Sequence, residues 1–189
     1  QVTGLDQLTG STTAKNVLTV GSFSMNDTGT NKGTTDFSSA GPTNDFRIKP
    51  EVCGPGENLG VAAWAQDEPT ATDRYRASSG TSFASPAVAG GVALLQQLHK
   101  STFDTYMDGA AMKALLCHTA DDITDWEGQD ITGPDVKTGY GAVNLEKAAL
   151  LIEKDEKETL TIHAFELDQG ETETLYFQTT AVGEFLTAT

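Results

Sequence analysis

The chain has 189 residues, of which 38% are hydrophobic and 21% are charged, and its formal net charge at pH 7 is −15. This length is enough for one sizeable hydrophobic core, and the composition is that of a folded protein rather than a disordered one. The acidic balance argues against nucleic acid as a partner, because phosphate groups would be repelled. No apolar run approaches the about 18 residues of a membrane-spanning helix, so we predict no membrane partner.

Strands are predicted in the first third of the chain. The apolar and β-branched runs Asn16–Gly21, Ile48–Cys53 and Asn58–Trp64 are each short and are bounded by glycine, proline or polar residues, a pattern typical of buried strands. Polar residues between these runs, at 24–35 and 67–72, predict loops.

Helices are predicted in the second part of the chain. From Phe83 to His99 the large apolar residues recur at helical spacing with alanine and glycine between them, which predicts a helix packed closely on most sides. Asp108 and Asn144 are predicted to cap two further helices, ending near His118 and Leu151. Strands followed by helices indicate an α/β domain with a largely parallel sheet.

The pattern changes after Glu153. Polar and apolar residues alternate in 159–165, 172–177 and 185–189, on either side of a predicted turn at Asp168–Gly170, as in antiparallel strands. We therefore predict two units: an α/β domain over residues 1–153, and the beginning of a β-sandwich-like, β-rich C-terminal domain over residues 154–189.

The two cysteines, Cys53 and Cys117, each lie in an apolar run. Two buried free thiols are the favoured interpretation, and a Cys53–Cys117 disulfide is the alternative.

An acidic segment follows the second predicted helix; its carboxylates are Asp121, Asp122, Asp125, Glu127, Asp130 and Asp135. Their spacing does not match an EF-hand loop, so a solvated acidic turn is favoured over a calcium site. No cofactor is required by this interpretation, and calcium remains the alternative.

The segment Ser79–Gly91 carries the chemistry that the sequence suggests. Ser82 follows Gly80 and Thr81 and immediately precedes a predicted helix. A hydroxyl group in that position can attack a carbonyl carbon, and the amide at the positive end of the helix can stabilise the resulting oxyanion. The alternative is that Ser82 is only the N-cap of the helix, as most serines before helices are.

Five segments in order resemble the subtilisin-like protease (subtilase) family. They are Asn16–Gly21, Phe37–Pro42, Arg47–Gly56, the nucleophile-like motif Gly80–Gly90, and the pair Thr119–Asp122 with Thr138–Asn144. The resemblance covers residues 14–152. It implies the C-terminal part of a subtilisin-like largely parallel sheet flanked by helices, with Ser82 as catalytic nucleophile and Gly80 and Thr81 in the nucleophile and oxyanion turn.

In this family an aspartate orients a histidine, and the histidine takes the proton of the serine; the chain order is Asp, His, Ser. No histidine precedes Ser82, whereas His99, His118 and His163 follow it. Asp27 imitates the family's aspartate motif, but after the wrong strand, and we interpret it as part of a turn. The resemblance therefore implies that the Asp, the His and the oxyanion Asn belong to an N-terminal fragment that pairs with this chain.

The first hypothesis is a secreted (extracellular or periplasmic) serine endopeptidase that acts on polypeptide substrates through an acyl-enzyme on Ser82, with this chain inactive alone. The second is a catalytically inactive subtilase-like fragment that acts as a structural or binding piece. A third, an unrelated acyl hydrolase, requires His99 or His118 to lie against Ser82.

Overall fold

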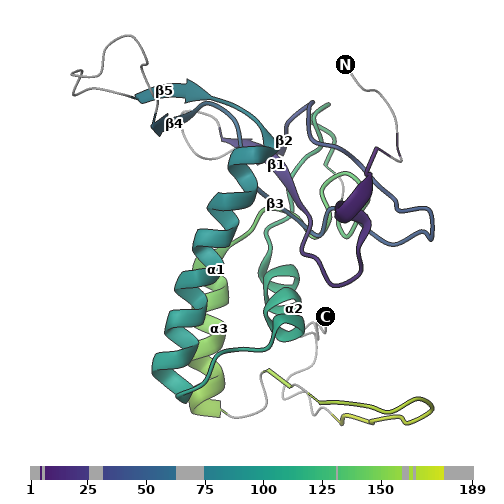
Figure 1. Ribbon diagram of the computed structural model, residues 1–189, viewed down its shortest axis with the longest axis vertical. Coiled ribbons are helices and arrows are strands. Elements are labelled where there is room, and N and C mark those ends of the chain that lie inside the picture. The colour runs from purple at the N-terminus through teal and green to yellow at the C-terminus, as the bar shows by residue number, and fades with distance from the viewer. Residues whose placement is uncertain are drawn as a thin grey trace.

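A three-stranded sheet, a separate two-stranded hairpin and three α-helices make up the part of the chain that the structure describes (Figure 1). The structure is a computed structural model and describes residues 5, 7–25, 32–62, 75–130, 132–158, 162–163 and 165–176. Asp27, interpreted as part of a turn, and the predicted end of the third strand at Trp64 lie outside these residues.

The sheet has the order β2-β1-β3. Strand β1 (Val20–Met25) is parallel to β3 (Val52–Pro55) and antiparallel to β2 (Lys32–Thr34). Strands β4 (Leu59–Ala62) and β5 (Tyr75–Ser78) form an antiparallel hairpin that projects from the end of the molecule where the first helix begins (Figure 1). The predicted α/β class is confirmed, with one parallel and one antiparallel strand pair in the sheet.

Two predicted strands begin later than expected. β1 begins at Val20 rather than Asn16, and β3 begins at Val52 rather than Ile48. The residues before each strand serve other contacts: the amide of Thr19 donates to the Glu51 side chain at 2.7 Å instead of joining a strand ladder. Periodicity alone could not show this, because the contact joins residues 32 apart in the chain.

The helices are α1 (Thr81–Phe103), α2 (Gly109–Thr119) and α3 (Leu145–Glu158); a short 3₁₀ helix, η1 (Gly10–Thr13), precedes the sheet. Both predicted caps are confirmed: the amide of Ala110 donates to Asp108 at 2.7 Å, and that of Lys147 donates to Asn144 at 3.0 Å. The expected end of α3 at Leu151 was wrong, because the following Glu, Lys and Asp residues continue the helix.

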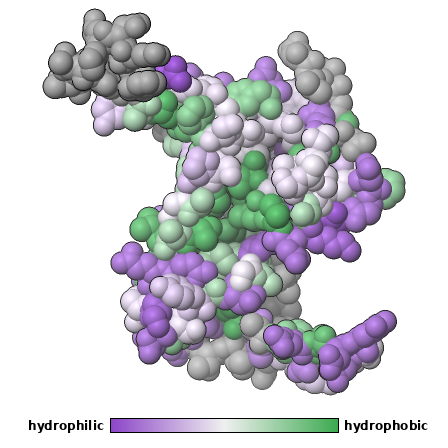
Figure 2. All heavy atoms as spheres, in the orientation of Figure 1, coloured by the Kyte–Doolittle hydropathy of each residue, from purple (hydrophilic) through white to green (hydrophobic). Residues whose placement is uncertain are grey.

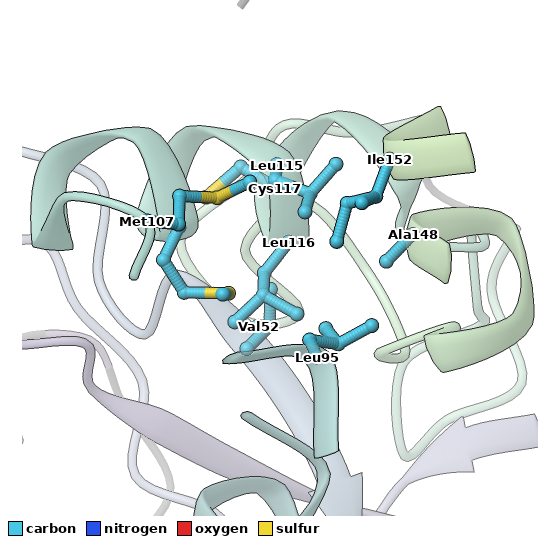
Figure 3. Close-up of a cluster of buried hydrophobic side chains, with 9 residues drawn as sticks. Val52, Leu95, Met107, Leu115, Leu116, Cys117, Ala148 and Ile152 are labelled. Atoms are coloured by element: carbon cyan, nitrogen blue, oxygen red, sulfur yellow. The ribbon is translucent and has the colours of Figure 1, made fainter. Parts of the chain in front are cut away.

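The hydrophobic core lies where the three helices meet β3. Val52 of β3, Leu95 of α1, Leu116 of α2 and Ile152 of α3 are at most 3% exposed and point toward one another (Figure 3). A Cβ atom on Gly91 would come within 2.5 Å of Leu145, so the absence of a side chain there allows α1 and α3 to approach closely.

Helix α1 is buried along one stripe only, formed by Ala84, Val88, Gly91 and Leu95. The expectation of close packing on most sides was wrong within the described structure: the other face is exposed, and Leu94 there is 64% exposed. Beside this helix, a hollow of about 350 Å³ is lined by apolar residues that include Leu18, Val20, Val92, Met112 and Leu116. Figure 2 shows apolar side chains gathered in the middle of this face, between the sheet and the helices.

Cys53 and Cys117 are both free and buried, as the favoured interpretation predicted. Cys117 belongs to the core between the helices (Figure 3), whereas Cys53 packs with Phe23, Ile123 and Ala142. Burial raises the pKa of Cys53 to about 12 and that of Cys117 to about 11, so both thiols are protonated at neutral pH.

A buried ion cluster joins the segment before β1 to β3 and α2. Glu51, 4% exposed, is paired with Lys49 at 2.5 Å and also with Lys113. The Lys49 ammonium donates to the Val17 carbonyl oxygen at 2.7 Å, and that of Lys113 donates to the Lys15 carbonyl oxygen at 3.0 Å. Burial lowers the pKa of Lys49, and the hydrogen bond to Glu51 opposes that effect.

The segment after α3 turns at Asp168–Gly170 as predicted, with the amide of Glu171 donating to the Asp168 carbonyl oxygen at 3.0 Å. Residues 165–168 and 171–176 contain no strand, and the other residues expected to form strands lie largely outside the described structure. The separate C-terminal domain remains a prediction. Among the helices of the described residues, none combines the length and apolar character needed to cross a membrane.

Replacement of Glu51 by Gln should lower the free energy of unfolding by about 3 kcal/mol, because the buried Lys49 and the partly exposed Lys113 would lose their counter-charge. Urea denaturation measures the loss. Glu166→Gln, at an exposed carboxylate, is the control and should change the value by less than about 0.5 kcal/mol. Equal effects of the two substitutions would contradict this role of Glu51.

In the folded chain, both thiols should react with a disulfide-exchange reagent at pH 8 more than about 100-fold more slowly than in denaturant, because the thiolate is the reacting species. A count of free thiols in denaturant tests the disulfide alternative at the same time. Rapid labelling in native buffer, or no thiol released by denaturation, would contradict the burial of two free cysteines.

Candidate active site

Ser82 is the second residue of α1, and its side chain is exposed. The N-cap of the helix is Gly80, which makes no side-chain capping bond. The alternative that Ser82 is only an N-cap is therefore wrong. Within the described residues, its hydroxyl oxygen makes no hydrogen bond, so it is open to a partner from outside.

The β4–β5 hairpin leads the chain directly into this turn. Past the paired residues Leu59 and Ser78, the amide of Asn58 donates to the Ser79 hydroxyl at 3.0 Å, and the amide of Gly80 donates to the Gly56 carbonyl oxygen at 2.7 Å. Gly80 has φ 152° and ψ 151°, a conformation that glycine adopts most readily. The turn before Ser82 is thus fixed by hydrogen bonds to the residues that follow β3.

The first turn of α1 leaves backbone amides available. The first amides that bond back into the helix are those of Phe83 and Ala84, which donate to the Gly80 carbonyl oxygen at 3.0 and 3.4 Å. The amide of Ser82 precedes them and has no acceptor among the described residues. Such an amide lies at the positive end of the helix dipole, where negative charge is stabilised.

Two glycines allow β3 to approach α1 closely. A Cβ atom on Gly54 would lie 2.7 Å from a Val88 methyl group, and one on Gly56 would lie 2.3 Å from the Ser22 hydroxyl and 3.0 Å from the Gly80 carbonyl oxygen. The Ser22 hydroxyl is fully buried and has no hydrogen-bond partner among the residues that the structure describes. Sequence reasoning missed both Ser22 and the reason for Gly56, although the Gly-Pro-Gly sequence at 54–56 marks an unusual strand end.

A pocket of about 160 Å³ adjoins the turn. It is lined by Thr81 and Val20, by the N-terminal segment Gln7–Thr9 with Thr12, and by Thr19, Gly21, Ser39 and Pro50. Two hydrogen bonds join Gln7 of this segment to Ala40. The backbone amide of Gln7 donates to the Ala40 carbonyl oxygen at 2.9 Å, and the Gln7 side-chain oxygen accepts from the Ala40 backbone amide at 3.0 Å. This small pocket, whose walls are both polar and apolar, was not predicted, because these walls come from segments far apart in the sequence.

The contacts that the structure gives for His99 and His163 are with residues other than Ser82. His99 lies 17 residues further along α1, about 25 Å away at 1.5 Å per residue, and its Nδ1 is 2.7 Å from the Thr105 carbonyl oxygen. His163 makes an edge-to-face contact with Phe165 beyond α3. His118 is in the last turn of α2. The hypothesis of an unrelated hydrolase with His99 as base is therefore wrong.

In the acidic segment after α2, the carboxylates of Asp121 and Asp125 are engaged within the chain. Asp125, 2% exposed, pairs with Lys137 at 2.7 Å, and Asp121 pairs with Lys147 at 2.6 Å. Burial alone would raise the pKa of Asp125, but hydrogen bonds from Lys137 and from two backbone amides hold that pKa below its usual value. The expectation of a solvated turn was thus wrong for Asp125. Within the described structure, no three carboxylate, thiol or imidazole groups gather to hold a metal ion.

Comparison with known proteins agrees with this geometry. The subtilase family model matches residues 2–143, and the chain therefore belongs to the subtilase family.

Individual relatives are proteases. The chain is 32% identical to a PII-type proteinase of Lacticaseibacillus paracasei over 130 residues, which is 64% of this chain and 6% of the relative. It is 35% identical to the minor extracellular protease Vpr of Bacillus subtilis over 95 residues, which is 50% of this chain and 11% of the relative. The CspB protease of Clostridium perfringens has a similar structure, with a TM-score of 0.59 and 27% identity over 79% of this chain and 29% of that one. The chain thus spans a small part of its curated relatives.

Replacement of Gly56 by Ala should destabilise the chain by about 1 to 3 kcal/mol, because the new methyl group overlaps the Ser22 hydroxyl. Thermal or urea denaturation measures the effect. Gly60→Ala in β4 is the matched control, since a Cβ atom there meets nothing within 4 Å. Adding Ser22→Gly should restore part of the loss, and full additivity of the two substitutions would contradict direct contact.

Proposed function

We propose that Ser82 is the nucleophile of a serine endopeptidase. The observation that carries this proposal is an exposed hydroxyl group in the first turn of α1, beside a pocket, in a chain of the subtilase family. The serine oxygen attacks the carbonyl carbon of a peptide bond, and its proton passes through a base to the leaving amine. Water then hydrolyses the acyl-enzyme on Ser82 and releases the second product.

The turn before Ser82 supplies stabilisation to this reaction. In the proposed mechanism, the negative oxygen of the tetrahedral intermediate lies near the free amide of Ser82, at the start of α1. Gly80 and Thr81 position that amide, because the bond from Gly80 to Gly56 fixes the turn. The adjoining pocket that includes Thr81 accepts a side chain of the polypeptide substrate.

The base is proposed to come from another polypeptide. Residues 1–81 contain no histidine, and the family's chain order places Asp and His before the serine. We propose that an N-terminal fragment of the same protease supplies the Asp, the His and the oxyanion Asn. The exposed face of α1 and the neighbouring apolar hollow support this partner, because Ala89, Gly90 and Ala93 are small and exposed and would allow close approach of another element.

A second candidate is a catalytically inactive subtilase-like fragment that acts as a structural or binding piece. The exposed face of α1 and the apolar hollow favour this candidate too, because they would allow association with another polypeptide even without catalysis. In either case we propose a secreted parent protein, in line with the relative that is named extracellular, and a division into residues 1–153 and a β-rich unit over 154–189.

A fluorophosphonate probe tests the nucleophile and the origin of the base. The chain alone should react slowly. Co-expression with the preceding N-terminal fragment should raise the labelling rate by several orders of magnitude, toward the about 10⁶-fold effect that loss of the histidine has on turnover in subtilisin. Ser82→Ala should abolish labelling, whereas Ser101→Ala, at an exposed serine near the far end of the same helix, should leave it intact.

Two outcomes would contradict parts of this proposal. Rapid labelling of the chain alone would show that a base is already present. Absence of labelling in a complex of two intact chains, confirmed by native mass spectrometry, would favour the inactive alternative.

A further inference from the structure

A larger pocket lies at the opposite end of the parallel strands from Ser82. Its volume is about 530 Å³, and its walls include Lys15, Phe46, Arg47, Ile48, Lys113 and Tyr140. Lys15 precedes β1 and Glu51 precedes β3, whereas Gly56, which bonds to the turn before Ser82, follows β3. We name this cavity the Lys15 pocket.

The Lys15 pocket is cationic in a chain whose net charge is −15. Three basic side chains and one carboxylate line it. That carboxylate, Glu51, is engaged by Lys49 and Lys113, and Arg47 pairs with Asp45 at 2.9 Å. The ammonium of Lys15 makes no ion pair or hydrogen bond with any residue of the described structure, so the pocket retains a positive charge for a ligand.

Phe46, which lines this pocket, is exposed and has an unfavourable backbone conformation. Its side chain is 85% exposed, and its φ is 61°. Asn58 and Asp104, the other described residues with positive φ that are not glycine, are of types that adopt this region more readily. Packing of the Phe46 ring in the core does not compensate for this backbone strain, because the ring is mostly exposed. Backbone strain of this kind is concentrated at ligand sites.

We propose that the Lys15 pocket binds a polypeptide segment in which an acidic side chain stands beside an apolar one. The carboxylate would pair with Lys15, and the apolar side chain would pack against Phe46, Ile48 and Tyr140. Charge complementarity selects this ligand, because the rest of the acidic molecule repels anions. The binding site itself does not depend on peptidase activity.

A role for the Lys15 pocket in binding the protease substrate, in addition to the site at Ser82, rests on the proposed function. Glu51 lines the pocket and Gly56 bonds to the turn before Ser82; they are five positions apart in nearly extended chain, or about 16 Å at 3.3 Å per residue. An extended substrate would need only about five residues to cover that span. The inference therefore names acidic polypeptides as the preferred substrate class.

Fluorescence anisotropy with a labelled Glu-Phe-Glu-Leu peptide tests the site in the Ser82→Ala chain, where turnover cannot interfere. Binding should be saturable and should weaken at least fivefold with Lys15→Glu. Lys157→Glu, an exposed lysine at the end of α3, is the control with the same charge change and should bind like the parent. The Gln-Phe-Gln-Leu peptide should bind at least fivefold more weakly.

Phe46→Gly separates a ligand role from a structural one. It should weaken binding at least fivefold while the melting temperature stays equal or rises, because glycine relieves the positive φ. The proposal is overturned if Lys157→Glu weakens binding as much as Lys15→Glu, if both peptides bind equally, or if Phe46→Gly leaves binding unchanged. Binding in the Ser82→Ala chain without labelling of the two-chain complex would instead leave the pocket established and the peptidase proposal refuted.

Discussion

The close approach between the end of β3 and the start of α1 is the constraint on which the candidate site depends. Gly54 allows Val88 of α1 to contact the strand, and Gly56 accepts the hydrogen bond from Gly80 that fixes the turn before Ser82. A side chain at Gly54 would collide with Val88 of α1, and one at Gly56 would collide with Ser22 of β1 and crowd the Gly80 carbonyl oxygen. The exposed hydroxyl group is therefore positioned by backbone contacts rather than by side-chain hydrogen bonds.

The two ends of the parallel strands differ in chemistry. The carboxyl end carries Ser82 and, at the start of α1, a backbone amide without an acceptor among the described residues. The amino end carries the buried cluster of Lys49, Glu51 and Lys113 and, beside it, the Lys15 pocket. The ion cluster anchors the segment before β1, so the same contacts that stabilise the fold also shape the cationic wall of that pocket.

The helix that bears Ser82 is covered on one side only. Its buried stripe joins the core, whereas Ala89 and Val92 line an apolar hollow beside the helix, and apolar side chains gather in the middle of the face shown in Figure 2. A helix normally buries its apolar surface against the elements that pack beside it. The uncovered face supports the proposal of a partner polypeptide that covers this side of the helix.

The sequence by itself determined what depends on neighbouring residues. Asp108 and Asn144 predicted two helix starts, because capping involves amides two or three residues away. The motif around Ser82 predicted the nucleophile turn and the family. Only the tertiary structure decided where β1 and β3 begin, why Gly56 has no side chain, which face of α1 is exposed and where the pockets lie. These features depend on contacts such as Thr19 with Glu51 and Gly80 with Gly56, which bring together residues that sequence periodicity treats as unrelated.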